Sequence, residues 1–210
     1  MLDFKQKLIH SFNASLPGID AQYKMAPTHR KKTTELINEI NTYKLSAVLI
    51  VLYFNKNIND WCVPLIKRVN NGGAHSGQIG LPGGTFESED INLKNTAIRE
   101  CYEEIGISDF EVIGQLTEVY IPVSKFKVEP HIAISPNTTL NYKLQQSEVE
   151  QIIELPLSLL LNNAIVKEEY IKIDNNLKNK TPYFDVKGFK VWGATAMILS
   201  ELKEILNPIY

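Results

Sequence analysis

The chain has 210 residues, of which 44% are hydrophobic and 22% are charged, and its formal net charge at pH 7 is −2. This composition is typical of a globular protein, the length favours one domain with additions, and two cysteines are too few for a disulfide framework. No segment approaches the roughly 18 consecutive apolar residues of a membrane helix, and the near-neutral charge argues against electrostatic binding of nucleic acid.

The N-terminal segment predicts both a helix and a location. Apolar residues recur at helical spacing between Phe4 and Phe12, so residues 2–13 are expected to form an amphipathic helix that ends before Pro17. The same segment carries the acidic Asp3 and a polar residue every few positions. Because a secretory signal has a basic start and an apolar stretch, we expect a cytoplasmic protein.

Two strands and a glycine-rich loop come next. Residues 46–54 are an almost continuous apolar run rich in Val and Ile, which predicts a buried strand. Residues 61–67 can pair with that strand across a polar turn. Residues 70–84 contain six glycines and one proline, so we expect a shaped loop there.

The second half of the chain alternates strands with helices. The apolar residues of segment 91–105 fall on one helical face, and Gly106 is placed to end this helix. Further strands are predicted at 110–121, 128–135, 149–155, 164–173, 183–186 and 189–192. Further helices are predicted at 156–161 and 194–206.

Three carboxylates of the helix at 91–105 are the strongest indication of chemistry. Glu100 lies three residues before Glu103 and four before Glu104, so the carboxylates are expected to converge on one patch. Because neighbouring like charges destabilise a helix, we expect a cation there, and Mg²⁺ or Mn²⁺ prefers such oxygen ligands. Arg99 can pair with Glu103 at i,i+4. A solvated acidic face is the alternative, but the preceding glycine-rich loop suits a phosphate or metal site.

The segment from Gly84 to Ile107 resembles a family signature. Its second half, Arg99-Glu100-Cys101-x-Glu103-Glu104-x-Gly106-Ile107, is similar to the pattern R-E-U-x-E-E-x-G-U of the Nudix box, in which U is apolar. The first half has Asp90 in place of a glutamate and one extra residue before the arginine. Both departures resemble the coenzyme A pyrophosphatases of the Nudix hydrolase family, as does the loop sequence HSGQIGLPGG at residues 75–84.

This resemblance implies a fold and an activity. The fold is expected to be α/β, an α/β/α sandwich with a mixed β-sheet that forms a single domain over residues 1–210. Within it, residues 1–42 would be an N-terminal extension, 84–107 the Nudix box region and 194–206 a C-terminal helix. The activity implied is metal-dependent hydrolysis of the diphosphate of coenzyme A or its derivatives, which yields 3′,5′-ADP and 4′-phosphopantetheine.

The resemblance also implies roles for the box residues. Mg²⁺ or Mn²⁺ would be held by Glu100 and Glu104, with Glu103 assisting and the carbonyl of Gly83 as a further ligand. Arg99 belongs to the same catalytic set, and its spacing suits a residue that orients the carboxylates. The general base stays open among three carboxylates, Glu100, Glu118 and Glu129.

Four residues are candidates for contacting the substrate. Arg68 leads into the glycine-rich loop and can bind phosphate oxygens with two N–H groups. His75 lies in that loop, where a phosphate contact and a structural hydrogen bond are both open. Lys125 and Phe126 belong to a later loop that either touches the substrate or forms a solvated tip. Gly73 stands where the coenzyme A subfamily has a second arginine, so the expected selectivity for coenzyme A is weaker.

Two alternatives to coenzyme A hydrolysis stay open. The first is hydrolysis of another nucleoside diphosphate derivative, such as ADP-ribose or a dinucleotide. The second is a non-catalytic Nudix module that senses a nucleotide, but such a module has no need of metal-gathering carboxylates. The expected partner is a small nucleotide, without nucleic acid or membrane, and monomer and homodimer both stay open.

Overall fold

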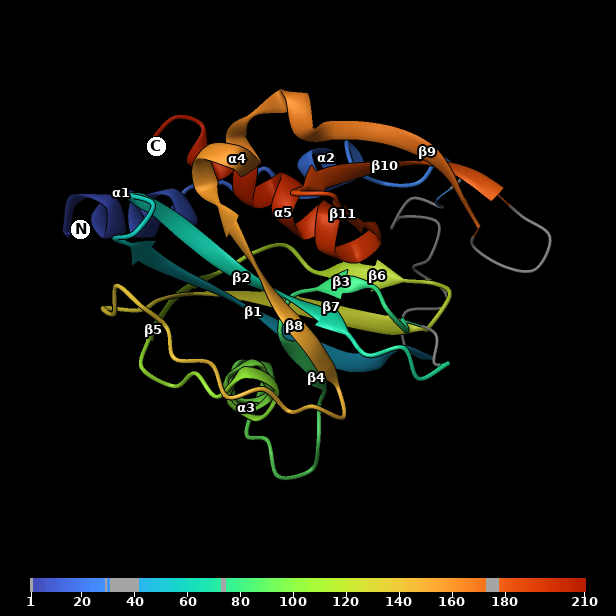
Figure 1. Ribbon diagram of the computed structural model, residues 1–210, viewed down its shortest axis with the longest axis horizontal. Helices are drawn as coiled ribbons and strands as arrows, with labels where there is room; N and C mark the ends of the chain where they lie inside the picture. Colours follow the sequence, from blue (N-terminus) through green and yellow to red (C-terminus); the bar gives the residue numbers. More distant parts are fainter. Residues whose placement is uncertain (1, 29, 31–41, 73–74, 173–177) are drawn as a thin grey trace.

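The computed structural model describes residues 2–28, 30, 42–72, 75–172 and 178–210, and its centre is a β-sheet (Figure 1). The strands are β1 (Lys44–Asn55), β2 (Asp60–Arg68), β3 (Ile79–Gly80), β4 (Gly83–Thr85), β5 (Glu111–Gln115), β6 (Val119–Ile121), β7 (Phe126–Ile134), β8 (Val149–Pro156), β9 (Val166–Lys172), β10 (Lys178–Val186) and β11 (Phe189–Trp192). The helices are α1 (Leu2–Asn13), α2 (Gly18–Tyr23), α3 (Leu93–Ile105), α4 (Leu157–Leu161), α5 (Gly193–Leu206) and the 3₁₀ helix η3 (Asn163–Ile165).

Strand β1 organises the mixed sheet, whose order among the described strands is β3-β2-β1-β7-β5. It runs parallel to β7 from Lys44 to Leu52. Its other edge pairs antiparallel with β4 near its start and with β2 near its end. Strand β8 joins the sheet through β2, and β6 joins it through β7, while β9, β10 and β11 form a separate antiparallel sheet.

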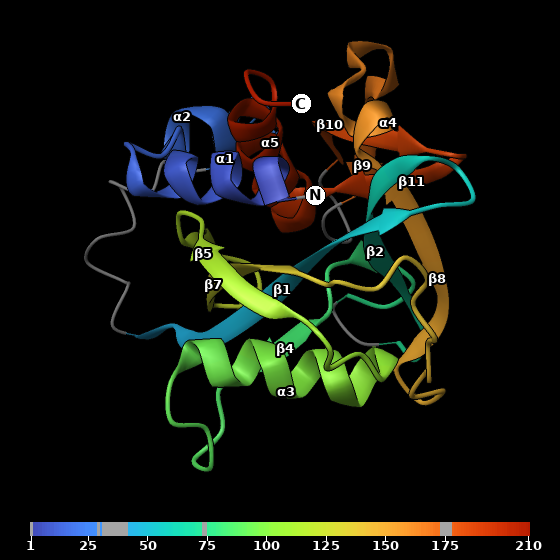
Figure 2. The same ribbon diagram turned by 90° about the vertical axis from the view of Figure 1, so that its left-hand side faces the viewer.

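The two faces of β1 belong to two hydrophobic cores. Leu49 and Val51 pack toward Cys101 of α3, whereas Ile50 and Leu52 belong to the core beneath the other helices. This alternation follows from the two-residue period of a strand, and burial of both faces explains why the sequence of β1 is almost continuously apolar. Figure 2 shows α3 on one face of the sheet and α1, α2 and α5 on the other.

A buried carboxylate connects α2, α5 and the sheet. Glu201 of α5 is completely buried, and its oxygens accept hydrogen bonds from Gly18 N at 3.2 Å, Gln22 Nε2 at 2.9 Å and Thr117 Oγ1 at 2.7 Å. A buried charge is tolerated when hydrogen-bond donors surround it. This network therefore positions α2 against α5 and the segment between β5 and β6.

The sandwich with a mixed sheet is confirmed, and the elements at 2–13, 46–54, 61–67, 149–155 and 189–192 lie as predicted. Both cysteines are buried free thiols. Among the described helices, none has the length and apolar character needed to cross a membrane.

Three local predictions were wrong or incomplete. The strand predicted at 110–121 is two strands, β5 and β6, which residues 116–118 separate. The loop at 70–84 contains the short strands β3 and β4, and α2 follows the break at Pro17. Residues 31–41 of the predicted N-terminal extension lie outside the described part of the chain.

Candidate active site

Helix α3 carries the site, and local sequence defines both of its ends. Asn92 is the N-cap, with its side-chain oxygen accepting a hydrogen bond from Asn95 N at 3.0 Å. At the other end Gly106 has a left-handed φ of 75°, and its N–H donates to Tyr102 O at 2.9 Å. The apolar face, including Cys101, is buried against β1, so the acidic residues line the side that meets β4.

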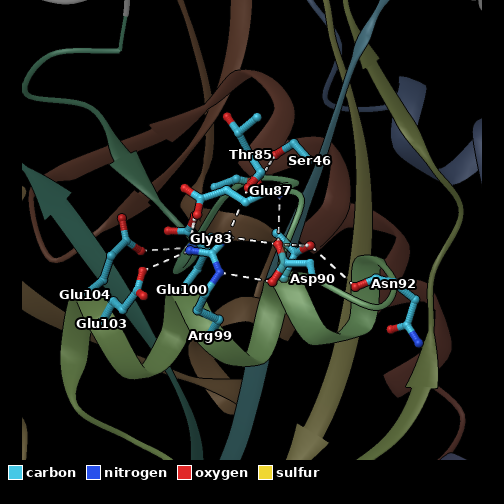
Figure 3. Close-up of polar contacts among 12 residues, drawn as sticks. Ser46, Gly83, Thr85, Glu87, Asp90, Asn92, Arg99, Glu100, Glu103 and Glu104 are labelled. Atoms are coloured by element: carbon cyan, nitrogen blue, oxygen red, sulfur yellow. Dashed lines mark hydrogen bonds and ion pairs between the residues drawn. The ribbon is translucent and has the colours of Figure 1, made fainter.

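Arg99 is the hub of the polar network (Figure 3). Its Nε and Nη2 each donate to one oxygen of Asp90 at 3.0 Å, and Nη2 also donates to Thr85 O at 3.1 Å. Its Nη1 donates to Glu100 Oε1 at 3.1 Å and to Glu103 Oε2 at 2.9 Å. A guanidinium has five N–H donors, so these five hydrogen bonds use all of them. The structure thus makes Arg99 an orienting group.

Asp90 is held as an anion. The hydrogen bonds from Arg99 are the main reason that the pKa of Asp90 falls to about 2, and hydrogen bonds from Glu87 N and Thr96 Oγ1 act in the same direction. Its side chain is almost fully buried. The aspartate at this position, a departure from the common Nudix box, therefore fixes Arg99 through a two-pronged ion pair.

Glu104 is a buried carboxylate with one unsatisfied oxygen. Its side chain is 2% exposed, and Oε2 accepts a hydrogen bond from Gly83 N at 2.8 Å. Its Oε1 has no hydrogen-bond partner and lies 3.4 Å from Arg68 Nη2. Burial raises the pKa of Glu104 to about 7, the charges of Glu100 and Glu148 add to the rise, and Arg68 opposes it.

Two glycines let β4 approach α3 and β1 closely. A Cβ on Gly84 would lie 2.2 Å from Glu100 Oε1, and a Cβ on Gly83 would lie 2.3 Å from Ala47 O. Because no side chain fits at either position, the Glu100 carboxylate lies directly against the β4 backbone. Burial raises the pKa of Glu100 as well.

The three predicted carboxylates lie near one another but do not by themselves form a metal-binding group. Within the described ranges, no group of three or more His, Cys, Asp or Glu side chains is arranged to hold a metal ion. Glu103 is 53% exposed and shares Arg99 Nη1 with Glu100. The less exposed candidate ligands are Glu100, which lies against the backbone at Gly84, and Glu104 and the Gly83 carbonyl, which both lie within 3.4 Å of Arg68 Nη2. This donor set contains only oxygen and includes a buried carboxylate atom without a hydrogen bond, so it fits a hard divalent cation.

A polar cavity of about 340 Å³ is lined by Arg68, whose guanidinium lies 3.4 Å from Glu104 Oε1. It brings together two predicted substrate contacts, Arg68 and His75, and its lining consists of Arg68, Val69, Asn71, His75, Ser76 and Glu148. Sequence reasoning missed Glu148. No local motif marks this residue, because it reaches the site only through the pairing of β8 with β2, in which Glu148 O accepts a hydrogen bond from Val69 N.

The structure places the remaining candidates for substrate contact, and His75, in different surroundings. His75 Nδ1 is 3.2 Å from Gln78 Oε1, which supports a structural role within the loop. Lys125 has a positive φ of 51° in the turn before β7, and Phe126 packs against the core under the helices. Neither residue lines the 340 Å³ cavity. Gly73 lies outside the described residues.

Two candidates for the general base lie beside basic side chains away from the cavity. Glu118 Oε1 is 2.6 Å from Lys127 Nζ, and its Oε2 accepts a hydrogen bond from Tyr120. Glu129 Oε1 is 2.8 Å from His131 Nε2. Neither carboxylate lines the cavity that contains Arg68, whereas Glu148 does.

Comparison with known proteins identifies relatives of this chain. A family model described as NUDIX domain matches residues 44–171. The chain is 34% identical over 143 residues to the uncharacterized Nudix hydrolase NudL of Enterobacter sp. (strain 638), covering 66% of this chain and 71% of the relative. It is 30% identical to the human mitochondrial coenzyme A diphosphatase NUDT8, covering 65% of this chain and 58% of that protein. A MutT protein from Methanosarcina mazei Go1 has a similar fold, with a TM-score of 0.51 at 18% identity, covering 79% of this chain and 95% of that structure.

Proposed function

The chain belongs to the Nudix hydrolase family, which acts on diphosphate bonds, and from this premise we propose that it hydrolyses coenzyme A or its derivatives with Mg²⁺ or Mn²⁺. The products would be 3′,5′-ADP and 4′-phosphopantetheine. The observation that carries the proposal is that Glu104 and the Gly83 carbonyl both meet Arg68, which lines the 340 Å³ cavity, while Glu100 lies against the neighbouring Gly84.

Different residues of the proposed site would bind the metal, orient the carboxylates and accept the proton. Glu100, Glu104 and Gly83 O would hold the divalent ion, which when bound acts as a Lewis acid and activates water. Arg99 keeps Glu100 and Glu103 oriented through its hydrogen bonds. Glu148 is our candidate for the base that takes a proton from the attacking water, because it lines the cavity and its charge acts on Glu100 and Glu104.

The choice of coenzyme A has two supports. The loop at 75–84 resembles the coenzyme A subfamily, and the human relative is named a coenzyme A diphosphatase. Gly73, in place of the subfamily's second arginine, removes one charge-assisted contact. Such a contact is worth roughly 1.5–3 kcal/mol, so we expect weak selectivity against 3′-dephospho-coenzyme A.

A substrate panel tests the proposal. Coenzyme A, acyl-coenzyme A, 3′-dephospho-coenzyme A, ADP-ribose, NADH and diadenosine polyphosphates are incubated with the protein and Mg²⁺ or Mn²⁺, and the products are identified by mass. We expect coenzyme A to have the highest kcat/KM, with Glu100→Gln as the control for contaminating activity. A preference for ADP-ribose or a dinucleotide would replace the coenzyme A assignment. Gly73→Arg should increase the preference for coenzyme A over its 3′-dephospho form.

The cellular setting is part of the same proposal. We place the enzyme in the cytoplasm as a protein that acts on a small nucleotide, whereas the human relative is named mitochondrial. Fractionation of the native cell, with detection of the protein by antibody, tests this location.

A further inference from the structure

The guanidinium of Arg68 contacts the oxygens that the proposed function assigns to the metal. Its Nη2 donates a hydrogen bond to Gly83 O at 3.0 Å and lies 3.4 Å from Glu104 Oε1. That Glu104 oxygen has no hydrogen-bond partner. The side chain of Arg68 therefore supplies positive charge at the position where a divalent cation would meet these two ligands.

The guanidinium of Arg68 can also extend into the neighbouring cavity. Its side chain is 32% exposed and lines the 340 Å³ cavity with His75 and Ser76. The pairing of β2 with β8 shifts register between Lys67 and Arg68. Such an irregularity changes the direction in which a side chain leaves the strand. Arg68 thus lies between the buried carboxylate and an open polar cavity.

We propose that Arg68 and the divalent cation compete for Gly83 O and Glu104 Oε1, so that cation binding releases the guanidinium into the cavity to bind a phosphate of the substrate. This inference rests on the proposed metal site. The competition makes metal and phosphate binding mutually favourable, because each ligand removes Arg68 from a contact that opposes the other. Arg68 is then a substrate-binding residue that couples the two binding events.

The first test measures Mn²⁺ affinity without substrate, from the electron paramagnetic resonance signal of free Mn²⁺. Arg68→Gln removes the competing cation, so we expect it to bind Mn²⁺ about 5-fold or more tightly than the wild type, as loss of a partly exposed charged contact implies. Lys67→Gln is the matched control: it removes the same charge from the adjacent residue, whose ammonium pairs with Glu150 at 2.6 Å. This control should bind Mn²⁺ as the wild type does.

High salt separates competition from long-range repulsion. In 0.5 M NaCl the repulsion between exposed charges is largely screened, so a gain in Arg68→Gln that persists supports direct competition. A gain that disappears in salt, or equal affinities in the two proteins, overturns the inference while leaving the metal site in place. Failure of both proteins to bind Mn²⁺ overturns the proposed metal site and the inference with it.

A crystal structure of the wild type with Mn²⁺ gives an independent reading. We expect Mn²⁺ at Glu104 and the Arg68 guanidinium in the cavity, beyond hydrogen-bonding distance of Gly83 O. An Arg68 that keeps its contact with Gly83 O while Mn²⁺ is bound at Glu104 would contradict the competition.

Discussion

Arg99 and Glu104 show how single residues prepare this site. Arg99 uses all five of its donors on protein oxygens, so its positive charge orients carboxylates and leaves no N–H group for a substrate. Glu104 is the opposite case, since one of its oxygens is buried without a hydrogen bond. On the same helix, Arg99 therefore has all of its hydrogen-bond donors satisfied, whereas Glu104 has an acceptor that is not satisfied.

Substitution of Arg99 should affect turnover more than substrate binding. Arg99→Lys keeps the charge but has three donors in place of five, so the orientation of Glu100 and Glu103 is lost. Groups that orient metal ligands typically contribute about 10- to 100-fold to activity or metal affinity. We expect kcat and Mn²⁺ affinity to fall in this range, measured by steady-state kinetics and Mn²⁺ titration. A rise in KM with unchanged kcat would instead assign Arg99 to substrate binding.

Glu104→Gln should separate activity from stability. The variant removes a charge but keeps an oxygen for the Gly83 N–H, so turnover should fall by about 100-fold or more. Burying a charge costs free energy, so without metal at pH 8 its melting temperature should be equal to or above that of the wild type. Glu103→Gln is the control, with a smaller loss of turnover because Glu103 is half exposed. Activity of Glu104→Gln within a few-fold of the wild type would refute the metal site.

At the scale of elements, the site depends on the contact between β4 and α3. Strand β4 is held against β1 by the pairs Ala47 to Gly84 and Val48 to Gly83. The hydrophobic core that contains Leu49, Val51 and Cys101 holds α3 against β1. Both contacts bring Glu100 against a backbone that has no side chain at Gly84.

Gly84→Ala should therefore damage activity more than folding. The added Cβ lies 2.2 Å from Glu100 Oε1, so the carboxylate has to move, and a displacement of this size can cost about 100-fold in rate. The moving group is the end of a flexible side chain, so the melting temperature should change by only a few degrees. Gly80→Ala is the matched control, because its Cβ would meet nothing closer than 3.9 Å. Equal activity of the two variants would show that this approach is unimportant.

At the scale of the whole molecule, the sheet also buries polar groups outside the site. His131 of β7 is 4% exposed, and its Nε2 lies 2.8 Å from Glu129 Oε1. Burial, with a smaller effect from Lys94, lowers the pKa of His131 to about 4. The neutral imidazole is therefore the form that the folded protein prefers above this pH.

The stability of the protein should consequently decrease in mild acid. An unfolded histidine has a pKa of about 6.5, so below this pH the unfolded chain takes up a proton that folded His131 does not bind until about pH 4. The free energy of unfolding should thus fall as pH drops from 6.5 toward 4, with His131 contributing about 1–2 kcal/mol by pH 5. Urea titrations of His131→Gln should show a smaller decrease in the free energy of unfolding over this pH range than the wild type shows. His10→Gln, at an exposed position of α1, should keep the wild-type slope.

The sequence by itself determined the elements whose signals are local. The periodicity of 46–54, the cap at Gly106 and the i,i+4 spacing of Glu100 and Glu104 predicted β1, α3 and the carboxylates, because these patterns depend on residues within one or two turns. The same local information identified Arg99 as the partner of Glu103.

Only the tertiary structure decided which distant residues complete the site. Glu148 enters the cavity through the pairing of β8 with β2, and Arg68 meets Glu104 across 36 positions of sequence (104 − 68). It also split segment 110–121 and left Glu103 exposed, where it shares Arg99 Nη1 with Glu100. The reason is that strand pairing and burial join residues far apart in the chain, and no local spacing carries that information.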